Sequence, residues 1–267
     1  MSVTLAGAAL ALVLLAWPGS AARAADKATR NSDSLLAKAE RIIRAYPEHL
    51  DRLEGRDLVW KDGTRMPFDD GETNKPFQTL LDRPDIEDQL ALRYPLEFSR
   101  QPPPLNFDPG RFRNEQFFAK MYGDCTKGEV ARKVTSVAWL PKRGGGMLQV
   151  TTVNGVATKL RAVSDELEQL PAKFTKFLVP AAGGYVCRVI AGTNNRSVHS
   201  YGAAIDINAA AGDYWRWQTK GGYQYRNKVP PEIVRIFEKH GFIWGGKWYH
   251  FDTMHFEYRP ELLQGRE

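Results

Sequence analysis

Residues 197–208 read SVHSYGAAIDIN, and this stretch decides the fold of the C-terminal half. In a β-strand over 203–208, successive side chains would point to opposite faces of a sheet. One face would carry three apolar side chains, those of Ala203, Ile205 and Ile207. The other face would present Asp206 beside the small Ala204. The pattern therefore predicts a core strand with a carboxylate on its second face.

His199 precedes this strand, and Gly202 between them allows the chain to turn back. A histidine and an aspartate can then converge on one point. A second segment, 248–257 (WYHFDTMHFE), supplies further imidazoles and acids. Two histidines and one carboxylate are a typical ligand set of catalytic zinc, with the fourth position left to water. Zinc lowers the pKa of that water towards neutrality, so the two segments predict a hydrolytic metal centre.

The run S-x-H-x-x-G-x-A-x-D, followed far downstream by an H-F-E strand ending, resembles the VanY-type D-alanyl-D-alanine carboxypeptidases. It is similar as well to the related L-alanyl-D-glutamate endopeptidases, and both groups are zinc peptidases that act on peptidoglycan. The first motif is matched at Ser197, His199, Gly202, Ala204 and Asp206. The resemblance covers roughly residues 121–260. It implies a hedgehog/D-Ala-D-Ala-peptidase-like fold and a Zn²⁺ ion held by His199, Asp206 and His255.

The general base that the resemblance implies lies three residues before His255, where many relatives have glutamate. This chain has Asp252 there, as branches of the family do, and aspartate is one methylene shorter. On strict strand alternation Glu257 shares a face with His255 and Asp252 does not, unless a turn separates the two. We expect Asp252 to be the base. Glu257 is the main alternative, or a group that holds a ligand, and His250 is the third.

Arg188 ends a Gly-Tyr-x-x-Arg run that enters the site loop, and relatives place an arginine from a similar region near the zinc. It is expected to stabilise the oxyanion or to hold a substrate carboxylate, the alternative being a structural salt bridge. Ser197 is expected to bind substrate or to orient the loop, since no nucleophile elbow surrounds it. Three further residues are expected to line the cleft: Arg196, Thr193 and Tyr201.

The region from residue 121 predicts an α+β fold with a small antiparallel sheet and flanking helices. Asn154-Gly155, between two β-rich runs over 148–153 and 156–160, predicts a hairpin. A helix is expected from Ser164 to about Leu178, a strand over Tyr185–Ile190 and a helix over Pro230–His240. These residues, 121–267, constitute the predicted zinc peptidase domain.

Residues 25–120 predict a mainly helical N-terminal region without a chemical signature. Apolar residues at helical spacing mark a helix over 33–45, with Asp33 as the expected N-cap. Two more helices are expected, from Ile86 to Arg93 and from Phe112 to Met121.

The first 24 residues predict a signal peptide, because an apolar run is followed by Ala22-Arg23-Ala24. Cleavage after Ala24 would give an exported, periplasmic or extracellular protein without a membrane span. Exported proteins can keep disulfides, so Cys125 and Cys187 are compatible with one bridge, the alternative being two buried thiols. A CxxC spacing is absent, which disfavours cysteine as a metal ligand.

The net charge of +6 comes from basic residues scattered among acids, without a nucleic-acid-binding motif, so no nucleic-acid partner is expected. The expected substrate is the peptide stem of peptidoglycan, and D-alanyl-D-alanine carboxypeptidase activity is the preferred interpretation. An endopeptidase of the L-alanyl-D-glutamate type and a non-catalytic, zinc-containing wall-binding module are the alternatives. Tyr214, Trp215, Trp217 and Trp244 are expected to be core or loop anchors, with a sugar-stacking platform as the other interpretation.

Overall fold

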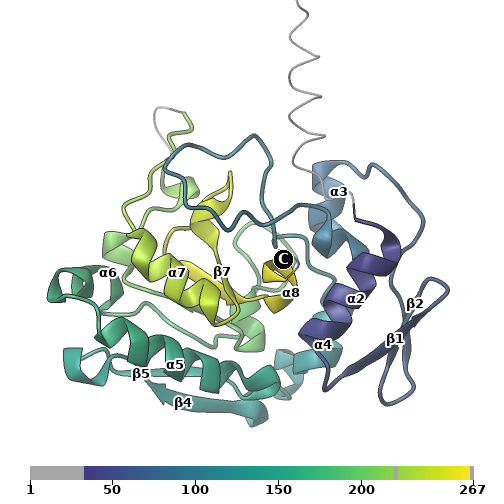
Figure 1. Cartoon of the computed structure of the whole chain (residues 1–267), viewed down its shortest axis with the longest axis horizontal. Helices are drawn as coiled ribbons and strands as arrows, with labels where there is room; N and C mark the ends of the chain where they lie inside the picture. Colours follow the sequence, from purple (N-terminus) through teal and green to yellow (C-terminus); the bar gives the residue numbers. More distant parts are fainter. Residues whose placement is uncertain (1–32, 219–221, 265–267) are drawn as a thin grey trace, which may run out of the picture.

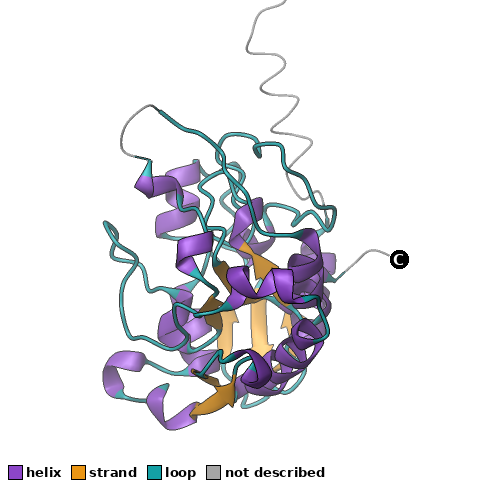
Figure 2. Ribbon diagram, turned by 90° about the vertical axis from the view of Figure 1, so that its left-hand side faces the viewer, coloured by secondary structure: helices purple, strands orange, loops and turns teal. Residues whose placement is uncertain are grey.

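The computed structural model describes residues 33–218 and 222–264. The predicted signal peptide lies outside the described residues. The fold class is α+β, as the sequence predicts, and its strands form three small antiparallel sheets. Figure 2 shows strands in the interior of the molecule with helices around them. Among the described residues, no helix has the length and apolar content needed to cross a membrane.

The sheet that carries the predicted site has the order β6–β8–β7, with β6 at Ala204–Asp206, β7 at Phe242–Trp244 and β8 at His255–Tyr258. Helix α7, Pro231–Lys239, packs against it, and Phe237 stacks on Phe256 with ring centroids 3.8 Å apart. The apolar face predicted for residues 203–207 is confirmed, because its three apolar side chains are at most 1% exposed.

The predicted hairpin around Asn154-Gly155 is wrong. Strand β5, Met147–Thr151, pairs instead with the preceding β4, Val134–Ala138. Asn154 and Gly155 do adopt left-handed conformations, but within a 3₁₀ turn that leads into helix α5, Val156–Glu168. The run after the turn has apolar residues at helical as well as at strand spacing, and tertiary burial selected the helix. Its buried side chains include Val156, Leu160, Val163 and Leu167.

Two other expected elements differ from the structure. The helix expected over 164–178 is the end of α5, followed by a 3₁₀ turn at Ala172–Phe174 and by α6, Thr175–Leu178. The strand expected over Tyr185–Ile190 is an extended loop, with an isolated bridge from Val189 to Arg196.

The N-terminal region contains the expected helices: α2 at Leu35–Ala45, a 3₁₀ helix at Glu87–Leu90 and α4 at Glu115–Tyr122. A further helix, α3, spans Phe77–Asp82. The N-cap of α2 is Ser34 rather than Asp33, since Ser34 Oγ accepts the Ala37 amide at 3.2 Å.

The region also contains a three-stranded antiparallel sheet that sequence analysis did not predict. Its strands are β1 at Leu50–Glu54, β2 at Asp57–Trp60 and β3 at Arg65–Pro67. Each strand is short, and charged side chains lie among the apolar ones, so no long alternating run marks the sheet.

One hydrophobic core contains residues from the N-terminal region and from the predicted peptidase domain. Tyr46 of α2 contacts Phe117 of α4, and Tyr201 of the site segment contacts Phe118. Figure 1 shows α2, β1 and β2 beside the C-terminal elements, with α8 (Pro260–Leu263) between them. The N-terminal region therefore packs directly on the elements that carry the site.

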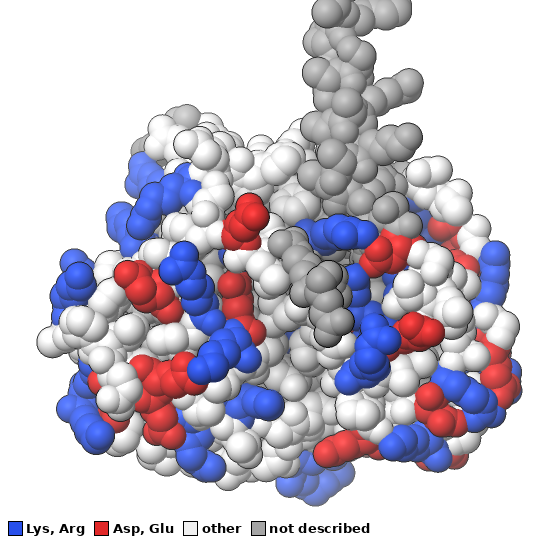
Figure 3. All heavy atoms as spheres, in the orientation of Figure 1, with Lys and Arg blue, Asp and Glu red and all other residues white. Residues whose placement is uncertain are grey.

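The predicted disulfide between Cys125 and Cys187 is present. It ties the 3₁₀ turn after α4 to the loop that contains Arg188. On the face in Figure 3, basic and acidic side chains are interspersed.

Candidate metal centre

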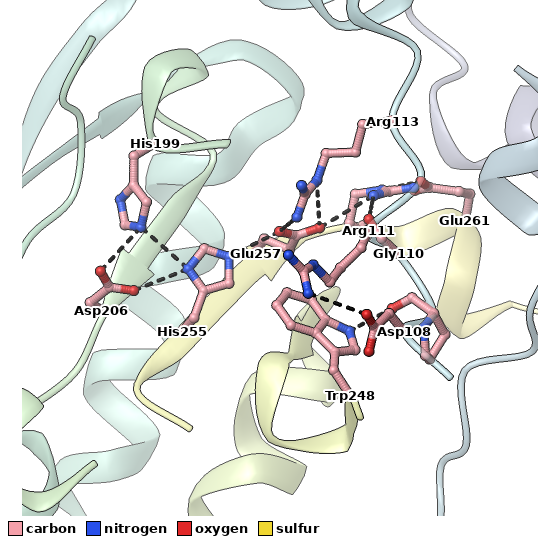
Figure 4. Close-up of polar contacts among 12 residues, drawn as sticks. Asp108, Gly110, Arg111, Arg113, His199, Asp206, Trp248, His255, Glu257 and Glu261 are labelled. Atoms are coloured by element: carbon pink, nitrogen blue, oxygen red, sulfur yellow. Dashed lines mark hydrogen bonds and ion pairs between the residues drawn. The ribbon is translucent and has the colours of Figure 1, made fainter. Parts of the chain in front are cut away.

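The sheet brings the predicted metal ligands together. Asp206 ends β6 and lies directly opposite His255 at the start of β8. His199 lies in a 3₁₀ helix, Val198–Tyr201, that ends at Gly202. Gly202 has φ +65°, and a Cβ there would lie 2.8 Å from the Thr151 backbone nitrogen, so glycine is needed for this turn. Figure 4 shows the side chains of His199, Asp206 and His255 converging on one point.

The distances between the converging atoms fit a metal ion. His199 Nε2 lies 3.2 Å from His255 Nδ1 and 3.3 Å from Asp206 Oδ2, and His255 Nδ1 lies 3.0 Å from Asp206 Oδ1. Ligands about 2.0–2.1 Å from a tetrahedral zinc ion are roughly 3.3 Å from one another. The three donors also have the chemistry that zinc prefers. His199, Asp206 and His255 therefore form a set that fits a zinc ion.

The outer ring nitrogens are held by the protein. His199 Nδ1 lies 2.7 Å from the Gly184 carbonyl oxygen, and His255 Nε2 lies 2.9 Å from Glu257 Oε2. A proton on each of these atoms fixes the tautomer that leaves His199 Nε2 and His255 Nδ1 free to bind a metal.

The charges of Asp206 and His255 shift the pKa of each other's side chain. Burial opposes ionisation of Asp206, but hydrogen bonds from His199 and His255 outweigh it and hold the pKa of this carboxyl well below its usual range. Burial would lower the pKa of His255, but contacts with Asp206 and Glu257 raise it to about 10. The partly buried carboxylate of Asp206 is thus ionised and can serve as an anionic ligand.

Asp252 lies beside this centre on a turn. Its carbonyl oxygen accepts the His255 amide at 3.2 Å, which is the turn that removes the objection from strand alternation. Its Oδ1 is buried and has no hydrogen-bond partner among the described residues. Burial raises the pKa of Asp252 to about 6, while the nearby His255 lowers it and Asp206 raises it. A carboxylate oxygen without a hydrogen-bond partner can accept a proton from water, as a general base must.

The two alternative bases are engaged elsewhere. Glu257 is fully buried and bonded to His255 and Arg113, which matches the interpretation of a group that holds a ligand. His250 Nδ1 lies 2.6 Å from Asp108 Oδ2, and the His250 amide donates to the same carboxylate at 2.9 Å. Of the two candidate carboxylates, only that of Asp252 has an oxygen without a hydrogen-bond partner among the described residues.

Arg188 and Ser197 lie on opposed segments of the site loop. The Ser197 amide donates to the Arg188 carbonyl at 3.2 Å, and Ser200 Oγ accepts the Arg188 amide at 2.9 Å. The Arg188 side chain is exposed and makes no ion pair with a described residue, so the alternative interpretation, a structural salt bridge, finds no partner among those residues. Burial raises the pKa of Tyr214, whose backbone forms a bridge with Asp252, and the charge of Arg188 is one of several that oppose this shift.

Arg196, Thr193 and Tyr201 line one cavity of about 50 Å³. A second cavity, of about 270 Å³, shares Glu115, Arg196 and Tyr201 with the first. The Arg196 amide donates to Glu115, and its guanidinium makes no ion pair within the part of the chain that the structure describes. Tyr201 is largely buried against Phe118, so it reaches the cavities only with part of its ring.

The aromatic residues near the site divide between core and surface. Trp244 is fully buried and stacks on Phe98, so it is a core residue. Trp215 contacts the ring of His250 with centroids 4.6 Å apart. Trp217 is 58% exposed to solvent.

Acidic side chains also gather in the N-terminal region, where their geometry alone would suit a cation. A buried lysine already occupies the centre of this group. Lys75 Nζ lies 2.8 Å from Asp70, 3.1 Å from Asp85 and 2.6 Å from Asp88. We therefore interpret this group as an internal ion-pair network.

Sequence analysis missed the residues that approach the centre from the N-terminal side. Arg113 binds Glu257, Arg111 lies over the Trp248 ring, and Asp108 holds His250. Arg113 lies 144 residues before Glu257 and Asp108 lies 142 residues before His250, so no local pattern marks these contacts.

Comparison with known proteins supports the resemblance. Residues 191–258 match the model of a peptidase family described as D-alanyl-D-alanine carboxypeptidase. The matched segment contains all three converging residues and Asp252. No curated protein and no solved structure matches the chain.

Proposed function

We propose that this chain, whose segment 191–258 is of the D-alanyl-D-alanine carboxypeptidase family, is a zinc-dependent peptidase that hydrolyses peptidoglycan stem peptides. The proposal rests on the convergence of His199, Asp206 and His255 within the matched segment. Beside them lies a carboxylate oxygen of Asp252 that has no hydrogen-bond partner among the described residues. A family match on its own would fit a protein that had lost its catalytic groups. The three metal-binding side chains and the unpaired oxygen of Asp252, the proposed base, argue against such a loss.

In this proposal His199 Nε2, His255 Nδ1 and the Asp206 carboxylate hold the zinc ion. When bound, zinc supplies Lewis-acid polarisation of the scissile carbonyl and favours ionisation of water at neutral pH. Asp252 Oδ1 accepts a proton from the attacking water and returns it to the nitrogen of the leaving amine.

The proposed substrate carries a free carboxylate, which favours carboxypeptidase activity and release of the terminal D-alanine. Arg188 and Arg196 support this choice, since the guanidinium of each is without an ion pair among the described residues. A bidentate pair with the carboxylate would position the last peptide bond for attack. The Cys125–Cys187 disulfide supports an exported, periplasmic or extracellular location.

An endopeptidase that cuts between stem residues is the second candidate, because the same cleft residues can bind a side-chain carboxylate within the stem. A non-catalytic wall-binding module is disfavoured by the Asp252 carboxylate. Nucleic-acid binding is disfavoured by the mixed charges of the surface in Figure 3.

The test is mass spectrometry of defined muropeptides incubated with the mature protein, with a chelator, and with zinc restored. Zinc-dependent loss of one terminal alanine is the expected result. A larger fragment would identify an endopeptidase. Intact stems after incubation with protein that carries zinc would contradict a peptidase and support the binding module.

A further inference from the structure

A chain of buried ion pairs runs from the N-terminal region to the proposed metal ligand His255 (Figure 4). Glu257 Oε2 lies 2.9 Å from His255 Nε2 and 2.6 Å from Arg113 Nη2. Arg113 Nε also approaches Glu257 Oε1, at 3.3 Å. One carboxylate oxygen thus receives hydrogen bonds from both the ligand ring and the arginine.

Arg113 is fixed by the backbone around it. Two carbonyl groups of the segment before Arg113 accept hydrogen bonds from the C-terminal elements. The Tyr249 amide donates to the Phe107 carbonyl oxygen at 2.8 Å, and Trp248 Nε1 donates to the Pro109 carbonyl oxygen at 2.7 Å.

 Asn114 caps helix α4, its Oδ1 accepting the Phe117 amide at 2.9 Å. The arginine therefore enters the site from a segment held on both sides.

The charge balance shows why Glu257 needs this arginine. Glu257 is fully buried, and a buried carboxylate is costly unless cations and hydrogen bonds compensate it. The second cation beside Glu257 is Arg259, whose Nη1 donates to Glu257 Oε1 at 3.2 Å. Arg259 Nε donates to Glu261 Oε1 at 2.5 Å. Glu261 in turn accepts the hydroxyl of Tyr46 at 2.7 Å. Two arginines thus balance two glutamates, and removal of Arg113 would leave this buried group with a net negative charge.

We propose that Arg113 is a positioning residue of the metal centre, which holds the Glu257 carboxylate against His255 Nε2 and thereby increases zinc affinity. The inference rests on the proposed zinc centre and gives the N-terminal region a role in it. Arg113 lies outside the matched segment 191–258 and before the predicted peptidase domain. Outer partners of metal-binding histidines typically contribute about 10- to 100-fold to metal affinity.

The experiment measures the zinc dissociation constant of the purified protein by competition with a chromogenic chelator. We expect Arg113→Gln to weaken zinc binding by about 10-fold or more. Arg113→Lys keeps the charge but loses the bidentate contact, so its zinc affinity should lie between those of Arg113→Gln and the wild type. Unfolding midpoints of the metal-free proteins are measured in parallel.

Lys247→Gln is the matched control. Lys247 Nζ lies 2.5 Å from the buried Glu238 and 2.6 Å from the Pro95 carbonyl oxygen, so this variant also removes a cation that joins the N-terminal region to the C-terminal elements. It is expected to lose stability while its zinc affinity stays within about 3-fold of wild type, since Glu238 touches no proposed ligand.

A double-mutant cycle covers the case in which Arg113→Gln folds poorly. In a Glu257→Gln background the carboxylate charge is gone, so Arg113→Lys is expected to change zinc affinity less than it does in the wild type. If the wild type and the Arg113 variants bind zinc with equal affinity, the role of Arg113 is wrong while the proposed function stands. The same conclusion follows if Lys247→Gln loses as much zinc affinity as Arg113→Gln. A wild-type protein that binds no zinc would overturn the proposed function together with it.

Discussion

Asp206 and His255 are directly opposed residues of the antiparallel pair β6–β8, and their side chains meet with Asp206 Oδ1 3.0 Å from His255 Nδ1. Two of the three proposed ligands are therefore positioned by strand register. A shift of one residue would move one of them to the other face of the sheet. Burial of the opposite face fixes the register of this sheet, and the register fixes the positions of Asp206 and His255.

Asp206→Ala is expected to abolish zinc retention and hydrolysis, because it removes the one anionic donor of the set. Elemental analysis after dialysis measures the zinc content, and circular dichroism checks that the fold is kept. A variant that retains one zinc per chain and normal activity would rule out Asp206 as a ligand.

Asp252→Asn is expected to lower kcat by about 100-fold or more, since general-base catalysis typically contributes 10²–10⁴-fold. Zinc content should stay at the wild-type level, because Asp252 is not in the proposed ligand set. Stem-peptide hydrolysis and zinc content are measured on the same preparation. Undiminished turnover would transfer the role of base to another group.

Arg188→Gln is expected to raise KM for a stem peptide with a free terminal carboxylate by about 10-fold, as a charge-assisted pair is lost. A substrate whose terminus is amidated should be cleaved poorly by the wild type and equally poorly by the variant. Arg196→Gln, tested beside it, shows which arginine binds the carboxylate. The same KM change with both substrates would argue against carboxylate binding.

Gly110→Ala is expected to destabilise the protein by about 2–4 kcal/mol, because overpacking costs about 1–3 kcal/mol and a left-handed backbone adds about 1 kcal/mol. Gly110 has φ +97°, and a Cβ there would lie 2.4 Å from Ile243 Cδ1.

Gly63→Ala is the control, since Gly63 has φ +83° but open space around it. Urea unfolding should show a loss of only about 1 kcal/mol for this variant. Equal losses in both variants would mean that the contact with Ile243 relaxes.

Replacing Cys125 and Cys187 by serine is expected to destabilise the fold by about 4 kcal/mol, since the bridge closes a loop with a sequence separation of 62. Urea unfolding with and without reductant measures the effect. The wild type should respond to reductant and the double variant should not. A wild type insensitive to full reduction would show that the bridge adds no stability.

The sequence predicted the α+β class, and it predicted the convergence of His199 and Asp206 because strand alternation over 203–208 and the spacing of His199 are local features. His255 was assigned to the set from the family resemblance. It failed where local signals were ambiguous. Asn154-Gly155 has the composition of a hairpin turn, yet burial of Val156 and its helical neighbours selected a helix.

Arg113 was beyond sequence reasoning for a different reason. It looks like any surface arginine until the fold brings it to Glu257, 144 residues later in the chain. Pairings of this kind depend on tertiary structure and have no sequence period.

That separation also bears on the order in which the protein assembles. Contacts between residues far apart in sequence form slowly, because a long loop must close before they contribute. The Arg113–Glu257 pair cannot form until the chain has been synthesised past residue 257. The proposed metal centre thus assembles only after these distant segments meet, and a chain that is still growing through residue 257 stays without it.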